Sequence, residues 1–255
     1  LHHYPQSPFA EKARLLLGFK GLSWHSVMIP PVMPKPDLTA LTGGYRRTPV
    51  LQVGADIYCD TALIARRLEQ EKAAPALFPE GQEAAAASLA QFADQVLFQH
   101  AVAINFQPKG LAERFAGMPE QVIKGFVADR QKLFSGGTAS RLDTEVALGQ
   151  WPALLSRLET QLERDGDFLL GSQPSIADFS HYHALWFVAS NRAVADALEP
   201  YPAVRAWMQR VRDIGHGSHA ELSADEAIRI AREATPAALP TDAISSPTGL
   251  AAGQA

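Results

Sequence analysis

The sequence predicts an α/β domain followed by an all-helical bundle. Strand-like and helix-like segments alternate in residues 1–72, whereas residues 82–235 carry helical patterns almost throughout. A stretch with two prolines at 73–81 separates the two parts, and we expect it to be the interdomain linker. Residues 236–255 are rich in Pro, Ala, Gly and Ser and have little to bury, so we expect an extended or flexible tail.

The first domain is expected to have the order βαβ-ββα. Apolar residues recur at helical spacing from Phe9 to Leu17, and Gly21 is a suitable helix end. Several prolines after residue 29 predict an irregular loop, and a Gly-containing turn at 54–56 separates two short strands. The expected elements are a strand ending near residue 4, a helix at 8–19, strands at 22–29, 48–53 and 57–59, and a helix from 60 to about 71.

The second domain is predicted to consist of helices alone. An Ala-rich stretch without interior Pro or Gly supports a long helix that ends before Pro108. Ser175 and Asp178 have the spacing of a capping box, with Asp where Glu or Gln is commonest. The expected helices lie at 82–106, 119–133, 144–164, 179–190, 203–214 and 221–234.

The turn at residues 4–14 is the strongest candidate for a binding site. Ser7 is a favourable N-cap residue, and Pro8 falls at the first helical position, where its missing N–H costs nothing. A hydroxyl at a helix N-terminus directly after a strand is well placed to receive an anion.

Composition and spacing exclude several classes of function. The net charge of −4 provides no overall basic field for nucleic acid, and no apolar stretch approaches the roughly 18 residues of a membrane helix. The single cysteine, Cys59, fits a reducing cytoplasm, where we expect the protein. We expect no metal site, because His181 and His183 point about 200° apart on one helix and His216 and His219 have no clustered acids beside them.

Four short motifs in this order resemble the cytosolic glutathione transferase superfamily, over roughly residues 1–215. Residues 7–14 (SPFAEKAR) resemble its strand-to-helix active-site turn, in the form where omega-like members have Cys-Pro-Phe. Residues 48–51 (TPVL) resemble its cis-proline segment, 60–64 (DTALI) its acidic-hydroxyl pair, and 175–178 (SIAD) its helical-domain cap. The resemblance implies a thioredoxin-like first domain and a homodimer.

The resemblance also implies residues that bind glutathione as co-substrate. Asp60 is expected to pair with the γ-glutamyl ammonium, and Thr61 to hold the carboxylate at that end. A cis peptide at Thr48-Pro49 would leave the backbone of Thr48 free to pair with the extended tripeptide, and a trans proline on an edge strand is the alternative. Arg47 is a candidate partner of the glycyl carboxylate, although a solvated side chain is the alternative; Lys35 and Arg46 are weaker candidates. Phe9 is expected to contact glutathione as well.

Ser7 is expected to donate a hydrogen bond to the bound thiolate, and Tyr4 is the alternative donor. A related branch has Cys in the position of Ser7, so mixed-disulfide chemistry is not expected here. Cys59 does not replace that thiol, because it lies at a strand end and is better explained as a small apolar residue.

The expected function is a glutathione transferase-like enzyme that activates the thiol for attack on a small apolar electrophile. Phe9, His100, Phe106 and Trp186 are candidates for the electrophile pocket, although aromatic residues on helices often belong to a core. The alternatives are a non-catalytic glutathione-binding or structural protein of the same fold, or a glutathione-dependent peroxidase or isomerase.

Overall fold

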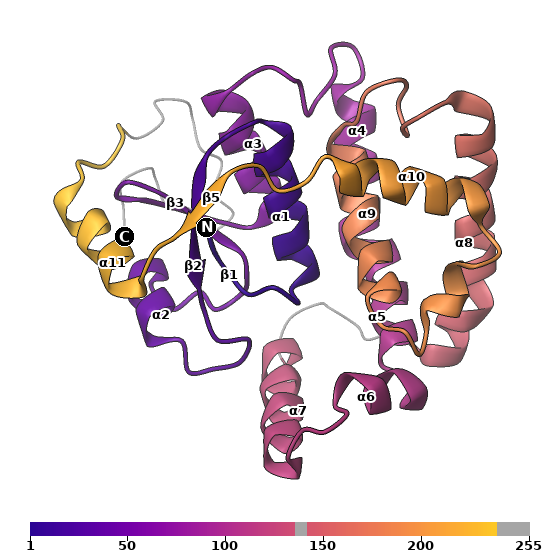
Figure 1. Cartoon of the computed structure of the whole chain (residues 1–255), viewed down its shortest axis with the longest axis horizontal. Helices are drawn as coiled ribbons and strands as arrows, with labels where there is room; N and C mark the ends of the chain where they lie inside the picture. Colours follow the sequence, from indigo (N-terminus) through magenta and orange to yellow (C-terminus); the bar gives the residue numbers. More distant parts are fainter. Residues whose placement is uncertain (136–141, 239–255) are drawn as a thin grey trace, which may run out of the picture.

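The first domain is a sheet with helices on it, in a computed structural model that describes residues 1–135 and 142–238 (Figure 1). The strands have the order β4-β3-β1-β2-β5, with β1 parallel to β2 and β3 antiparallel to both β1 and β4. This thioredoxin-like arrangement confirms the predicted fold. Its elements are β1 (His2–His3), α1 (Pro8–Phe19), β2 (Trp24–Met28), α2 (Pro36–Thr42), β3 (Val50–Val53), β4 (Asp56–Cys59) and α3 (Thr61–Glu71).

The second domain is a helical bundle built around α9. Nearly every residue of α9 is buried, and the helix packs against α4, α5 and α1. The predicted capping box is present, since the Asp178 carboxylate accepts from the Ser175 N–H at 2.8 Å. The elements are α4 (Glu83–Phe92), a π-helical turn (Ala93–Leu97), α5 (Phe98–Asn105), α6 (Pro108–Arg114), α7 (Glu120–Phe134), α8 (Thr144–Asp165), α9 (Ile176–Ala189), a 3₁₀ turn (Ala195–Leu198) and α10 (Pro202–Asp213).

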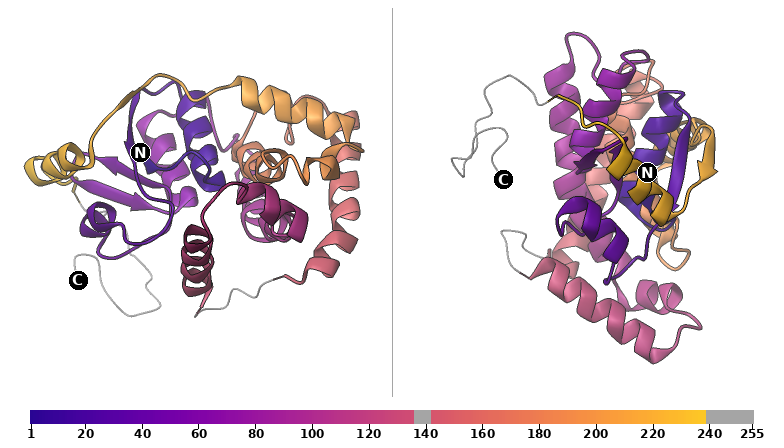
Figure 2. Two further views of the ribbon diagram at one scale, coloured as in Figure 1. Left: turned by 60° about the horizontal axis from the view of Figure 1, so that its bottom comes forward. Right: turned by 90° about the vertical axis from the view of Figure 1, so that its left-hand side faces the viewer.

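The C-terminal arm, which we define as residues 214–238, leaves the helical domain after α10. The prediction that the helical domain extends to residue 235 is therefore wrong. After α10 the chain returns to the first domain, adds β5 (His219–Glu221) to the sheet and then forms α11 (Ala224–Glu233), as Figure 2 shows. Strand β5 is parallel to β2, with Trp24 opposite His219. Local periodicity does not reveal this pairing, because the three residues of β5 are exposed and carry no strand pattern. Most of the expected tail lies outside the described residues.

Helix α2 is a second departure from the sequence-based expectation of a loop. Pro36 occupies its first turn, where a missing N–H is tolerated, and Gly43 ends it in the left-handed region at φ 62°. The prolines before it therefore mark a helix start and not a continuous irregular segment.

A buried ion pair joins the two domains. Lys12 of α1 donates to the Asp94 carboxylate at 2.6 Å, and His183 of α9 contacts the other carboxylate oxygen at 2.8 Å. Burial would raise the pKa of Asp94, but the Lys12 cation and the His183 hydrogen bond hold that pKa well below its usual range. The start of α1 is thereby held against the helical domain. Within the described residues, none of the helices is long and apolar enough to cross a bilayer.

Candidate functional site

Ser7 lies between the end of β1 and the first turn of α1, which opens toward α5, α6 and α7 (Figure 1). Its N–H donates to the Tyr4 carbonyl at 3.2 Å, and its Oγ accepts from the Ala10 N–H at 3.2 Å. This is the N-cap that the sequence predicts. The Oγ hydrogen has no acceptor among the described residues, so the hydroxyl is free to donate to a ligand.

The segment before β3 lies beside this turn. The Thr48-Pro49 peptide bond is cis, and within the described chain the backbone N–H and C=O of Thr48 form no hydrogen bond. Lys35 reaches the same segment, donating to Thr48 Oγ1 at 3.0 Å and lying 5.6 Å from the Tyr4 ring centroid. The unpaired backbone of Thr48, its hydroxyl and the Lys35 ammonium therefore lie beside the turn that carries Ser7.

A basic cluster, defined as Lys35, Arg46 and Arg130, surrounds this edge. Arg46 and Arg130 share one carboxylate, that of Asp129 on α7, whereas Lys35 is buried and pairs with no carboxylate in the described chain. Burial, reinforced by Arg130 and Arg46, lowers the pKa of Lys35 to about 8. Three cations around one carboxylate leave an excess of positive charge that suits an anionic ligand.

Asp60 begins α3 in a strained backbone conformation. Its φ of 81° makes it the one described non-glycine residue with positive φ, a state that costs about 1–3 kcal/mol and is common at functional sites. Its Oδ1 accepts from the Ala62 N–H at 2.8 Å, and the carboxylate remains exposed. Thr61 follows as the first, buried residue of the helix. The neighbouring Cys59 is half-buried, and burial together with Asp60 raises the pKa of its thiol, which argues against a thiolate there.

An aromatic wall lines the helical-domain side of the turn. We use this name for Phe9, Phe98, Phe106 and Phe187. Ring centroids lie 4.7 Å apart between Phe9 and Phe98, 6.0 Å between Phe98 and Phe187, and 6.4 Å between Phe187 and Phe106. Phe9, Phe98 and Phe106 are each only partly buried, so the wall offers an apolar surface two residues from Ser7.

Two family models together match most of the chain. The glutathione S-transferase N-terminal domain matches residues 1–76, and the glutathione S-transferase C-terminal domain matches residues 75–210. The chain belongs to the cytosolic glutathione S-transferase superfamily.

Solved structures agree with this membership. A GST-like protein from Pseudomonas syringae is 53% identical over 99% of this chain and 80% of its own, with a TM-score of 0.81. A glutathione S-transferase from Rhodospirillum rubrum F11 is 19% identical over 83% of this chain and 86% of its own, with a TM-score of 0.60, which shows a shared fold. No curated protein sequence matches the chain.

The predicted glutathione-site residues lie at three places in the first domain. Ser7, Tyr4 and Phe9 meet at the turn, Thr48 and Pro49 precede β3, and Asp60 and Thr61 begin α3. Arg47 differs from the expectation, because its side chain is exposed and forms no hydrogen bond or ion pair in the described residues, whereas the buried Lys35 reaches Thr48. Lys35 is therefore a better candidate than Arg47 for a ligand carboxylate.

The electrophile candidates divide into two groups. Phe9 and Phe106 belong to the aromatic wall, but His100 is buried with its ring nitrogens bonded to the Val96 carbonyl and to Gln150 of α8. Trp186 packs against the main core and makes no ring contact with the wall in the described chain. Phe98 and Phe187 of the wall were not predicted, because helical spacing alone does not distinguish a core aromatic from one at a domain junction.

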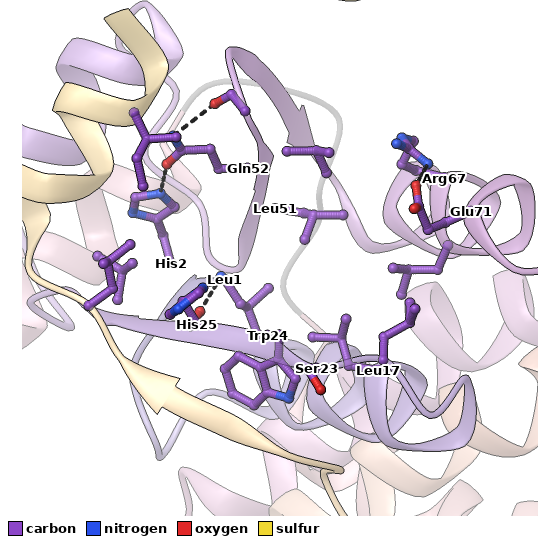
Figure 3. Close-up of a pocket in the computed structure, with 17 residues that line it drawn as sticks. Leu1, His2, Leu17, Ser23, Trp24, His25, Leu51, Gln52, Arg67 and Glu71 are labelled. Atoms are coloured by element: carbon purple, nitrogen blue, oxygen red, sulfur yellow. Dashed lines mark hydrogen bonds and ion pairs between the residues drawn. The ribbon is translucent and has the colours of Figure 1, made fainter. Parts of the chain in front are cut away.

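A cavity of about 300 Å³ lies at the opposite end of β1 (Figure 3). It is bounded by β1, β2, β3, α3 and α11 and contains the pairs His2–Gln52 and Arg67–Glu71. We place the candidate site at Ser7 and not in this cavity. The hydroxyl, the basic cluster and the strained Asp60 all lie elsewhere.

Proposed function

We propose that this protein is a glutathione transferase that activates the glutathione thiol for attack on a small apolar electrophile. The observation that carries the proposal is the Ser7 hydroxyl, which caps α1 through its oxygen and keeps its hydrogen for a ligand beside the aromatic wall. We also propose that it acts in the cytoplasm, since one cysteine fits a reducing compartment.

The charges of the first domain fit the tripeptide. The exposed Asp60 carboxylate suits the γ-glutamyl ammonium, and the N-terminus of α3 at Thr61 suits the carboxylate at that end. The unpaired backbone of Thr48 suits an extended peptide, and Lys35 suits the glycyl carboxylate. Arg47 remains an outer candidate for that carboxylate.

The thiol is the group that needs activation. A free thiol has a pKa near 8.5 and is mostly protonated at neutral pH. A donor hydrogen bond from Ser7 and the α1 N-terminus favour the thiolate, so glutathione and not the serine is the nucleophile. Tyr4 is the alternative donor, because it is partly exposed and precedes Ser7 in the same turn.

The test compares Ser7→Ala with Tyr4→Phe. The pKa of bound glutathione is measured from the ultraviolet absorbance of its thiolate, and conjugation is assayed with aryl halides, epoxides, enones and organic peroxides. Ser7→Ala is expected to raise that pKa by about one unit or more, since a hydrogen bond to a charged group contributes about 1.5–3 kcal/mol. Its effect on affinity should be small. An unchanged pKa in Ser7→Ala with a raised one in Tyr4→Phe would assign the role to Tyr4.

A protein that binds glutathione but turns over none of these compounds would instead be a ligand-binding or structural member of the superfamily. Calorimetry with S-methylglutathione makes this distinction, because it reports binding without turnover. Absence of binding would contradict both functions.

We also propose a homodimer. Leu63 on α3, Phe92 on α4 and Val96 in the π-helical turn are exposed apolar side chains, with 49%, 38% and 41% of their surface accessible. Phe92 and Val96 lie four residues apart on adjoining helical segments, and exposed apolar side chains grouped in this way are typical of a contact surface. Sedimentation equilibrium should give twice the chain mass, and Phe92→Asp should shift it toward one chain; a monomeric wild-type protein would contradict the proposal.

A further inference from the structure

Arg114 is a cation at the far end of the aromatic wall. It ends α6, and its guanidinium carbon lies 4.8 Å from the Phe187 ring centroid and 5.8 Å from that of Phe106. Its Nε is buried and has no hydrogen-bond partner in the described residues. No other described residue forms an ion pair with its guanidinium. Burial lowers the pKa of Arg114, and the Tyr4 side chain across the domain junction partly offsets this effect.

Arg114 differs from Lys12 and Arg14, two buried cations of α1 that have counterions. Lys12 pairs with Asp94, and Arg14 pairs with Glu11 at 2.6 Å. A guanidinium held on aromatic faces is positioned by cation–π contact, but this contact leaves its N–H donors without acceptors. The group is therefore fixed and still able to bind a planar anion.

Glutathione is not the expected source of that anion. The groups that suit its two carboxylates, Lys35 and the N-terminus of α3, both belong to the first domain. Arg114 belongs to the second domain and lies on the wall proposed for the electrophile.

We propose that Arg114 is a specificity-determining residue that selects an aromatic second substrate bearing a carboxylate. The ring of this substrate would lie on the aromatic wall and its carboxylate on the guanidinium, beside Tyr4. This inference rests on the proposed function, because it names the class of compound that meets the bound thiol.

The test is a binding comparison of two unreactive probes with the same ring, the anion 3,5-dinitrobenzoate and its methyl ester, which is neutral and larger by one methyl group. Calorimetric titrations use the full chain, with and without saturating S-methylglutathione. The carboxylate is expected to bind about tenfold more tightly than the ester, equivalent to about 1.4 kcal/mol. Arg114→Gln should abolish this preference, and Arg114→Lys should retain part of it.

Lys109→Gln is the matched control, because Lys109 lies on the same helix but faces solvent and pairs with Asp196 at 3.2 Å. This variant should keep the wild-type preference. If Arg114 has a structural role alone, Arg114→Gln should lower the affinity for both probes equally, and this result would overturn the proposal. Equal affinities in the wild-type protein, or no binding of either probe, also overturn it. Failure of S-methylglutathione to bind counts against the proposed function alone, since the charge preference is measured without it as well.

Discussion

Replacement of Gly18 by alanine is expected to destabilise the protein, although Gly18 lies inside a helix. Helix propensity alone favours alanine over glycine by about 1 kcal/mol. The structure reverses this sign, because the C-terminal arm crosses α1 at this residue. A Cβ at position 18 would lie 2.0 Å from the Gly215 carbonyl oxygen and 2.8 Å from its carbon, both backbone atoms that no rotamer change can move.

The expected loss follows from what must shift to relieve that clash. The arm is held near Gly18 by the Trp24 indole, which donates to the His216 carbonyl at 2.8 Å, and by the stacked rings of Trp24 and His219. Overpacking of a tight contact costs about 1–3 kcal/mol, and a backbone collision belongs at the upper end. We therefore expect Gly18→Ala to lower the free energy of unfolding by about 2–3 kcal/mol and Tm by about 4–12 °C.

The assay is urea unfolding followed by tryptophan fluorescence and circular dichroism. Gly149→Ala is the control, because Gly149 lies inside α8 and, apart from its chain neighbours and the backbone of its own helix, no heavy atom lies within 4 Å of its would-be Cβ. Gly149→Ala should raise the free energy of unfolding by about 0.5–1 kcal/mol through helix propensity. Equal free energies of unfolding for Gly18→Ala and Gly149→Ala would contradict the packing of the arm on α1. They would also count against the pairing of β5 with β2.

Two further predictions concern charged groups. Because the pKa of Lys35 is lowered to about 8, its cation is lost as pH rises, so the affinity for S-methylglutathione should fall above about pH 8. Lys35→Met should weaken this binding by about tenfold or more at pH 7 and remove that pH dependence in calorimetry. Asp94→Asn should lower the free energy of unfolding, measured in urea at pH 7, by about 3–5 kcal/mol, because Lys12 becomes an unpaired buried cation. The pKa of Asp94 is depressed in the folded protein, so the stability it contributes is present above its unfolded pKa of about 3.9 and is lost as pH falls below that value. Asp196→Asn, which breaks an exposed pair, should cost less than about 1 kcal/mol.

The local features of the site were predictable because each depends on a few adjacent residues. Ser7 and Pro8 specify a helix start, and Ser175 with Asp178 specifies another, through hydrogen bonds that span three positions. Helix α2 shows the limit of this reasoning, since prolines that suit a loop also suit a first helical turn.

Which cation lies beside Thr48 was not predictable in the same way. Arg47 and Lys35 have similar chemistry in the sequence, but only Lys35 is buried beside Thr48. The clustering of Arg46 and Arg130 around Asp129 depends on α7, which comes from the other domain.

The sequence by itself determined the two-domain order, the helix caps and the position of the Ser7 turn, because periodicity and capping are encoded within one element. Only the tertiary structure decided the return of β5 to β2, the approach of the arm to Gly18 and the placement of Arg114 on the aromatic wall. These features join residues that are distant in the chain, and their energies arise from burial, backbone contact and charge at surfaces that exist only after the chain has folded.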